Sequence, residues 1–211
     1  MVDGTITIIA LWTTILLLSS GWLDYLCAQE QLAKRWIFVY LLLPLPFWSI
    51  SIPFFNFDLL LGAFLLPFFL LLFFMIRQES SLRIHLIALS WLIALLTFLV
   101  RKVIQYDPIL LFIDEKVLLM LVGGVPAVFL ALHYRELLLS VLLGSYLAEI
   151  LYKYSIRQLA SSIPMGDAYF TDLVWMTLTF AFAIYILLYP LQGRIRSRKK
   201  AGQVSGGVRQ G

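Results

Sequence analysis

Long runs of apolar residues constrain the fold of this chain more than any other feature of its sequence. Seven of them come close to the roughly 20 residues that a helix needs to cross the hydrocarbon core of a bilayer. They cover residues 5–28, 36–52, 57–76, 84–100, 117–133, 137–158 and 173–191. They are rich in Leu, Phe and Ile and lack the alternation of β-barrel strands. We therefore predict an all-α fold, in which residues 1–191 form a polytopic bundle of seven transmembrane helices.

A six-span alternative stays open, in which the proline-containing segments 36–52 and 57–76 form a re-entrant pair. Composition agrees with either count: 62% of the 211 residues are hydrophobic and 13% are charged. Soluble domains are about half apolar and roughly a quarter charged. The chain therefore has no room for a separate soluble domain.

The basic residues predict how the chain is oriented in the membrane. With the N-terminus outside and the C-terminus in the cytoplasm, eleven of the 16 Lys and Arg residues fall on the inner side. Cytoplasmic loops carry such an excess, so we predict a multi-pass protein of the cytoplasmic membrane. Because the net charge of +4 is distributed by topology, we expect no nucleic-acid partner.

The last segment, residues 192–211, is basic and Gly-rich, and we predict a disordered cytoplasmic tail. Five bases follow the last span closely: Arg194, Arg196, Arg198, Lys199 and Lys200. They would attract anionic lipid headgroups by about 1 kcal/mol each. The same residues also fit a simple stop-transfer signal.

The run 137–158 combines a small-residue face with a carboxylate. Ser140, Gly144 and Ala148 recur every four residues and so share one face of a helix. Such a face lets a neighbouring helix approach closely, within this chain, in a homo-oligomer or in a membrane partner. The carboxylate is Glu149, which must find a partner because a bare charge in hydrocarbon is costly.

Three bases lie near Glu149 in depth or in sequence. Arg101 and Lys102 end the run 84–100, and Lys153 follows at i+4, a spacing that allows an ion pair. One interpretation is that these bases neutralise the acid and hold helices together. The other is that Glu149 faces a polar cavity and binds a cation or a proton.

Two further features bear on transport. Asp24 is a second acid, close to the inner boundary of the first run. Gly123, Gly124 and Pro126 lie at the centre of the run 117–133 and predict a broken helix. Broken helices at the midplane are typical of transporter substrate sites.

Motifs for catalysis are missing from the sequence. It contains no zinc-protease, nucleophile-elbow, phosphate-loop or dinucleotide fingerprint, so we predict no enzyme activity and no cofactor. His85 and His133 stand apart from other ligand residues, so we predict no metal site. An enzyme acting on lipid would rest on the pair Asp114–Glu115 and the long outer loop 153–172, and the pair also fits a helix start.

Several short stretches resemble the YphA-type family of small polytopic membrane proteins of endospore-forming Gram-positive bacteria. They are Tyr106–Pro108, the run with Gly144 and Glu149, and the loop Gly166–Asp172. The resemblance is best in the second half of the chain. It implies a protein of the cytoplasmic membrane with a link to sporulation, and it supplies no catalytic residues.

From these observations we predict a non-enzymatic membrane protein that scaffolds or assists a partner complex. The alternative is a small proton- or cation-coupled transporter or channel that uses Glu149 and a broken helix at Gly123–Pro126.

Overall fold

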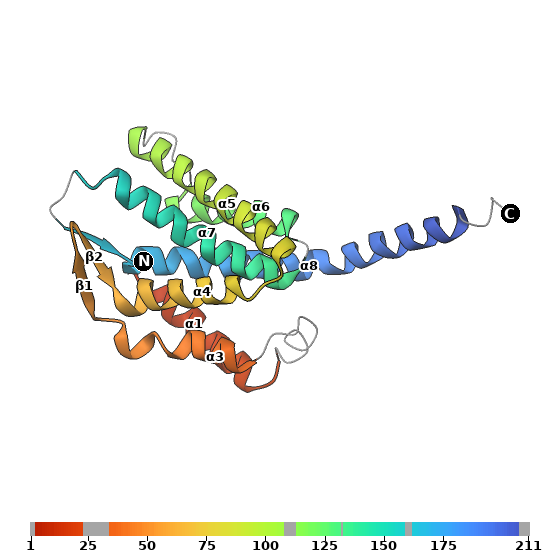
Figure 1. The fold of residues 1–211 in the computed structure, drawn as a ribbon, viewed down its shortest axis with the longest axis horizontal. Helices are drawn as coiled ribbons and strands as arrows, with labels where there is room; N and C mark the ends of the chain where they lie inside the picture. The colour runs from red at the N-terminus through yellow and green to blue at the C-terminus, as the bar shows by residue number, and fades with distance from the viewer. Residues whose placement is uncertain (1–2, 23–33, 108–112, 132, 159–161, 207–211) are drawn as a thin grey trace.

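The computed structural model describes residues 3–22, 34–107, 113–131, 133–158 and 162–206. Within these ranges the chain forms seven α-helices, most of which run lengthwise through the molecule and tilt against one another (Figure 1). They are α1 (Thr5–Ser19), α3 (Lys34–Leu42), α4 (Leu66–Ile76), α5 (Ser80–Tyr106), α6 (Glu115–Leu130), α7 (Tyr134–Ser155) and α8 (Ala168–Gly206). The predicted bundle of apolar helices is confirmed.

Successive helices of the second half run in opposite directions. Arg101, near the end of α5, lies against Glu115 at the start of α6. At the opposite end, His85 near the start of α5 lies beside Leu130, the last residue of α6. Alternation of this kind is what a chain that crosses a membrane repeatedly requires.

Helix length distinguishes the helical segments that could cross a membrane from shorter ones. Three helical segments are long and apolar enough to cross a membrane, namely Ser80–Tyr106, Tyr134–Ser155 and Ala168–Leu188. The shorter apolar helical segments are Thr5–Ser19, Ile37–Phe47 and Leu61–Ile76. The count of seven spans therefore stays a prediction.

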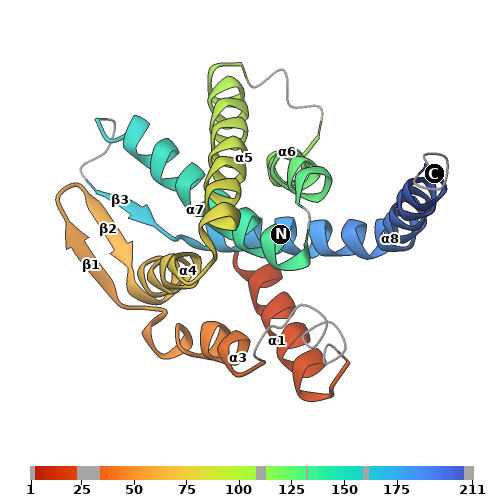
Figure 2. The same cartoon turned by 45° about the vertical axis from the view of Figure 1, so that its right-hand side comes forward.

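A small β-sheet lies at one end of the molecule and corrects the prediction of an all-α fold (Figure 2). Strand β1 (Ser51–Phe54) pairs antiparallel with β2 (Phe57–Leu60), and β3 (Ile163–Met165) pairs parallel with β2. The sheet interrupts the predicted spans 36–52 and 57–76. Apolar strands are indistinguishable from a buried helix by hydrophobicity alone, which explains the error.

Short irregular helices lead into and out of this sheet. After α3, Pro44 and Pro46 lack the N–H that an α-helix needs, and the chain continues as the 3-10 helix η1 (Leu45–Phe47). Beyond β2, the π-helix η2 (Leu61–Leu65) leads into α4. A Cβ at Gly62 would lie 2.3 Å from the carbonyl oxygen of Pro44, so only glycine fits where η2 crosses η1.

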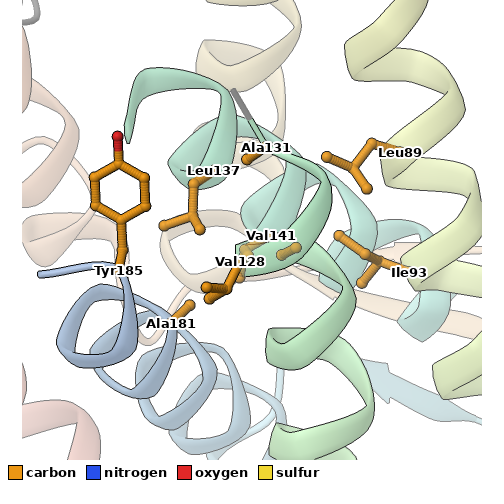
Figure 3. Close-up of a cluster of buried hydrophobic side chains, with 9 residues drawn as sticks. Leu89, Ile93, Val128, Ala131, Leu137, Val141, Ala181 and Tyr185 are labelled. Atoms are coloured by element: carbon orange, nitrogen blue, oxygen red, sulfur yellow. The ribbon is translucent and has the colours of Figure 1, made fainter. Parts of the chain in front are cut away.

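The main core fills the space between α5, α6, α7 and α8. Its buried side chains are Leu89, Ile93, Ala127, Val128, Ala131, Leu137, Val141, Ala181 and Tyr185. Figure 3 shows that they converge from the four helices onto one small volume. This core fixes the positions of the helix ends on which the charged residues lie.

The small-residue face of α7 is a packing surface inside the molecule. Ser140, Gly144 and Ala148 are all buried. A Cβ at Gly144 would lie 2.8 Å from the Cγ2 atom of Ile93 on α5. The face therefore serves the contact between α5 and α7 in this chain, and it is not available to a partner.

The predicted break at Gly123, Gly124 and Pro126 is wrong, because α6 runs without interruption from Glu115 to Leu130. Pro126 removes one helical hydrogen bond, but the helix ends one turn later, so little of it is strained. Gly124 faces α8 instead, and Gly123 lies between α8 and α5. A Cβ at Gly124 would lie 2.7 Å from the ring of Phe180, so this residue is small in order to admit the ring.

The tail also differs from the prediction of disorder, because α8 continues through residues 192–206 and extends well beyond the bundle (Figure 1). Extending an existing helix costs far less than starting one, since each added residue gains a hydrogen bond. Arg, Lys, Ala and Gln, which make up much of this segment, are good helix formers.

Candidate functional site

Glu149 lies inside the bundle, near the end of α7 that adjoins the sheet, and is 2% exposed. Its Oε2 atom accepts a hydrogen bond of 2.8 Å from Nη1 of Arg101 on α5. Its Oε1 atom lies 3.5 Å from Nζ of Lys153, one turn further along α7. Both carboxylate oxygens therefore face a base, as a buried charge requires.

Arg101 on α5 contacts residues of three other helices, α6, α7 and α8, through its guanidinium group. Besides Glu149 it approaches Glu115 at the start of α6, with 3.6 Å between Nε and Oε1. The guanidinium also lies over the ring of Tyr152 on α7, 3.8 Å from its centroid, and near the ring of Tyr169 on α8 at 5.0 Å. Aromatic faces stabilise a desolvated cation, so the arginine is held on several sides.

Lys153 extends the same group of charges to α8. Its Nζ donates a hydrogen bond of 2.8 Å to Oδ2 of Asp167, whose Oδ1 accepts from the backbone N–H of Phe170. Asp167 therefore caps α8 and neutralises Lys153 at the same time. We call Arg101, Glu115, Glu149, Lys153 and Asp167 the charged cluster; it joins the ends of α5 and α7 to the starts of α6 and α8.

A second group of polar residues joins α1 to α8 at the same end of the molecule. Asp172, 1% exposed, accepts hydrogen bonds from the N–H groups of Gly4 and Thr7 and from the Thr7 hydroxyl, at 2.8 to 2.9 Å. Nζ of Lys116 donates to Asp172 at 3.2 Å and to Asp3 at 2.6 Å. Asp172 thus caps α1 from another helix.

A small cavity adjoins the charged cluster. Its volume is about 10 Å³, which is close to the minimum for one water molecule. Arg101 and Glu149 line one side, and Thr97, Ser145 and Thr177 add hydroxyl groups. Space for a single water is enough to hydrate a carboxylate, but it is too small for an organic solute.

The structure brings together only part of the residues that the sequence singles out. Arg101 and Lys153 contact Glu149 as predicted. Lys102 does not: its Nζ donates to Gln105 and faces the ring of Tyr152. Asp24 and the side chains of the basic tail lie outside the described residues. Asp114 caps α6 by accepting from the N–H of Lys116 at 2.9 Å, in agreement with a helix start.

A third polar group lies at the opposite end, and the sequence analysis missed it. Glu136 on α7 is 1% exposed, and its carboxylate lies 4.0 Å from Nε2 of His85 and 3.6 Å from Nδ1 of His133. The spacing of His133 and Glu136 at i,i+3 was the available signal. Among the residues that the structure describes, no group of three or more His, Cys, Asp or Glu side chains is arranged to hold a metal ion.

Comparison with known families gives a match over most of the chain. A family model described as "YphA-like integral membrane protein" matches residues 4–201, almost the whole chain. Comparison with curated proteins and with solved structures gives no significant match.

Proposed function

Because the chain belongs to the YphA-like integral membrane protein family, we propose that it is a non-enzymatic scaffold or accessory protein of the cytoplasmic membrane. The observation that carries this proposal is the state of Glu149. Its carboxylate is ion-paired to Arg101 and Lys153, and the space beside it has a volume of about 10 Å³. An acid enclosed in this way stabilises a bundle, and it supports a protein that acts through contacts.

The partner is to be sought at the apolar faces that are exposed in the single chain. Photo-crosslinking amino acids at Phe69, Ile84, Phe129 and Leu187, exposed by 62%, 70%, 74% and 72%, sample four helices. We expect a discrete protein adduct in cells from at least one position, identified by mass spectrometry. A buried position, Leu137, is the matched control and should give intramolecular products only. Lipid adducts alone at all four positions would contradict the scaffold proposal.

The position of the basic tail supports a second contact, with anionic lipid. The backbone of α8 continues as one helix beyond the apolar segment Ala168–Leu188, so the bases at 194–200 begin within about 9 Å and end within about 18 Å of that segment along the helix. A soluble probe that carries this tail should bind phosphatidylglycerol vesicles. Binding should weaken when five bases are replaced with Gln, namely Arg194, Arg196, Arg198, Lys199 and Lys200. Equal recruitment would leave these bases with a stop-transfer role.

A role in sporulation is proposed from the family resemblance. Comparing the spore yield of a deletion strain with the yields of its parent and of the complemented deletion strain tests it directly. Unchanged yield would remove this part of the proposal and leave the membrane contacts to be explained otherwise.

One observation favours a transporter as the second candidate, namely the water-sized cavity that Glu149 shares with Thr97, Ser145 and Thr177. A carboxylate beside a water can exchange a proton. This candidate predicts proton-dependent flux in proteoliposomes that disappears in Glu149→Gln. Its other support, the broken helix, is lost because α6 is continuous.

A further inference from the structure

The hairpin formed by β1 and β2 exposes several large apolar side chains close together in the chain. Ile50, Ile52, Phe54 and Phe55 are exposed by 47%, 42%, 56% and 91%. We call these four residues the hairpin tip. No charged residue occurs between Ile50 and Phe57, so nothing in this segment opposes contact with lipid.

The backbone of β1 decides what can cover the hairpin tip. The register places Phe54 opposite Phe57 and Ile52 opposite Leu59, and the N–H of Leu61 donates to the carbonyl of Ile50. Backbone groups alternate in direction along an antiparallel strand, so Ser51 and Pro53 direct theirs to the free edge of the sheet. Pro53 has no N–H to donate there, which disfavours pairing with a strand of another protein.

The same free edge excludes the hydrocarbon core as its location. The outward carbonyls of Ser51 and Pro53 need hydrogen-bond donors, and lipid-exposed open sheet edges do not occur within hydrocarbon. Water and headgroups supply such donors at the interface. The edge therefore fits the headgroup region, where apolar side chains reach toward the acyl chains while the backbone stays solvated.

Helix length places the hairpin at this depth. The polar residues Arg77 and Glu79 follow α4, so the end of α4 lies at the opposite surface of the membrane. From there α4 with 11 residues and η2 with 5 residues rise about 24 Å. The hydrocarbon core is about 30 Å thick, so the end of β2 that joins η2, at Leu60, lies near the far boundary of the core.

We propose that the hairpin tip is an interfacial anchor, inserted into the phospholipid headgroup region of the leaflet that adjoins the charged cluster. This contact does not depend on the proposed scaffold role. The anchor holds the short helices α3 and α4 at a fixed depth in the membrane. The length of these helices alone does not set their depth.

Spin labelling of the full-length protein tests the depth. Cys27→Ser removes the one native cysteine, and Phe55→Cys then carries the label, in nanodiscs of phosphatidylethanolamine and phosphatidylglycerol. Oxygen concentrates in the acyl chains and a water-soluble nickel chelate stays outside, so the ratio of their collision rates reports depth. We expect a ratio between those of water and the bilayer centre. A label at Leu95→Cys, half-exposed near the middle of α5, calibrates the centre.

Three results would overturn the proposal. A ratio equal to that of a label free in water places the hairpin tip outside the membrane. A ratio equal to that at Leu95 places it in hydrocarbon. Low accessibility to both reagents, with dipolar broadening between labels, shows that a second copy covers it. Asn56→Cys, in the same turn and exposed, gives an independent reading if loss of the Phe55 ring disturbs the hairpin.

Discussion

Asp172 illustrates why a buried charge in this bundle is tied to a helix end. Its carboxylate receives the first free N–H groups of α1, where the helix dipole favours an anion, and the ammonium group of Lys116. Neither the pairing nor the partner helix could be inferred from the sequence, because Gly4 and Asp172 are far apart in the chain. The sequence shows only that Asp172 directly precedes the apolar run 173–191, and the residue that caps α8 is Asp167.

Replacing Asp172 by Ala should destabilise the protein by about 3 kcal/mol, because Lys116 then keeps only the exposed Asp3 and α1 loses its cap. The effect should be local. Hydrogen exchange measured by mass spectrometry in nanodiscs should show faster exchange in α1 and unchanged exchange in α7.

The control is Asp3→Asn, which removes the other carboxylate paired with Lys116. The side chain of Asp3 is 54% exposed. An exposed ion pair contributes less than about 1 kcal/mol, so α1 should stay protected. Equal loss of protection in both variants would show that Asp172 is not what fixes α1.

The residues around Glu149 were partly predictable. Arg101 and Lys153 follow from depth and from i+4 spacing, which are properties of single helices. Glu115 and Asp167 join them only because α6 and α8 begin beside the ends of α5 and α7, and the ring of Tyr152 on α7 meets Arg101 only because α5 and α7 pack together. That arrangement is tertiary, so one-dimensional patterns do not contain it.

Substitutions at two glycines in helix contacts can distinguish the effect of close packing on stability from the effect of helix propensity. A Cβ added to Gly144 on α7 would approach Ile93 to 2.8 Å, whereas one added to Gly123 on α6 would meet Thr177 at an ordinary 3.4 Å. Gly144→Ala should therefore destabilise the protein by about 1–3 kcal/mol through overpacking. Denaturant unfolding in detergent micelles measures the loss.

Gly123→Ala is the matched control, because the same change there gains helix propensity of up to about 1 kcal/mol. It should leave stability equal or raise it. The atoms nearest to the Cβ added at Gly144 are Cγ2 and Cβ of Ile93 and the carbonyl oxygen of Ser90, so only a shift of α5 against α7 can relieve the contact. Equal losses for Gly144 and Gly123 would contradict the packing role of the small-residue face.

The elements that could be predicted from the sequence are the helices marked by one property, a long apolar run. Apolar runs of spanning length gave α5, α7 and the first part of α8, with run ends up to six residues from the helix ends. The runs 36–52 and 57–76 failed because a hairpin between two short helices has the same composition as two spans. Pro44, Pro46 and Pro53 were the signals for irregular backbone.

Orientation is the property of the whole molecule that the charges predict most directly. With the N-terminus outside, Gln105 at the end of α5 faces the exterior and Glu79 at its start faces the cytoplasm, and both are exposed. In a Cys27→Ser background, an impermeant maleimide should label Gln105→Cys on intact cells and Glu79→Cys only after permeabilisation. The reverse pattern would establish the inverted orientation.

The central claim is that the charged cluster is structural, and a double-mutant cycle on Arg101 and Glu149 in nanodiscs tests it most directly. Arg101→Leu and Glu149→Leu should each cost about 3–5 kcal/mol in the free energy of unfolding, because each leaves a buried charge short of a partner. The double variant should cost much less than the sum. Lys102→Leu, next to Arg101 but not in contact with Glu149, should change stability by no more than about 0.5 kcal/mol. Additive losses, or a gain in stability from Glu149→Leu alone as expected of a residue kept for activity, would contradict the account.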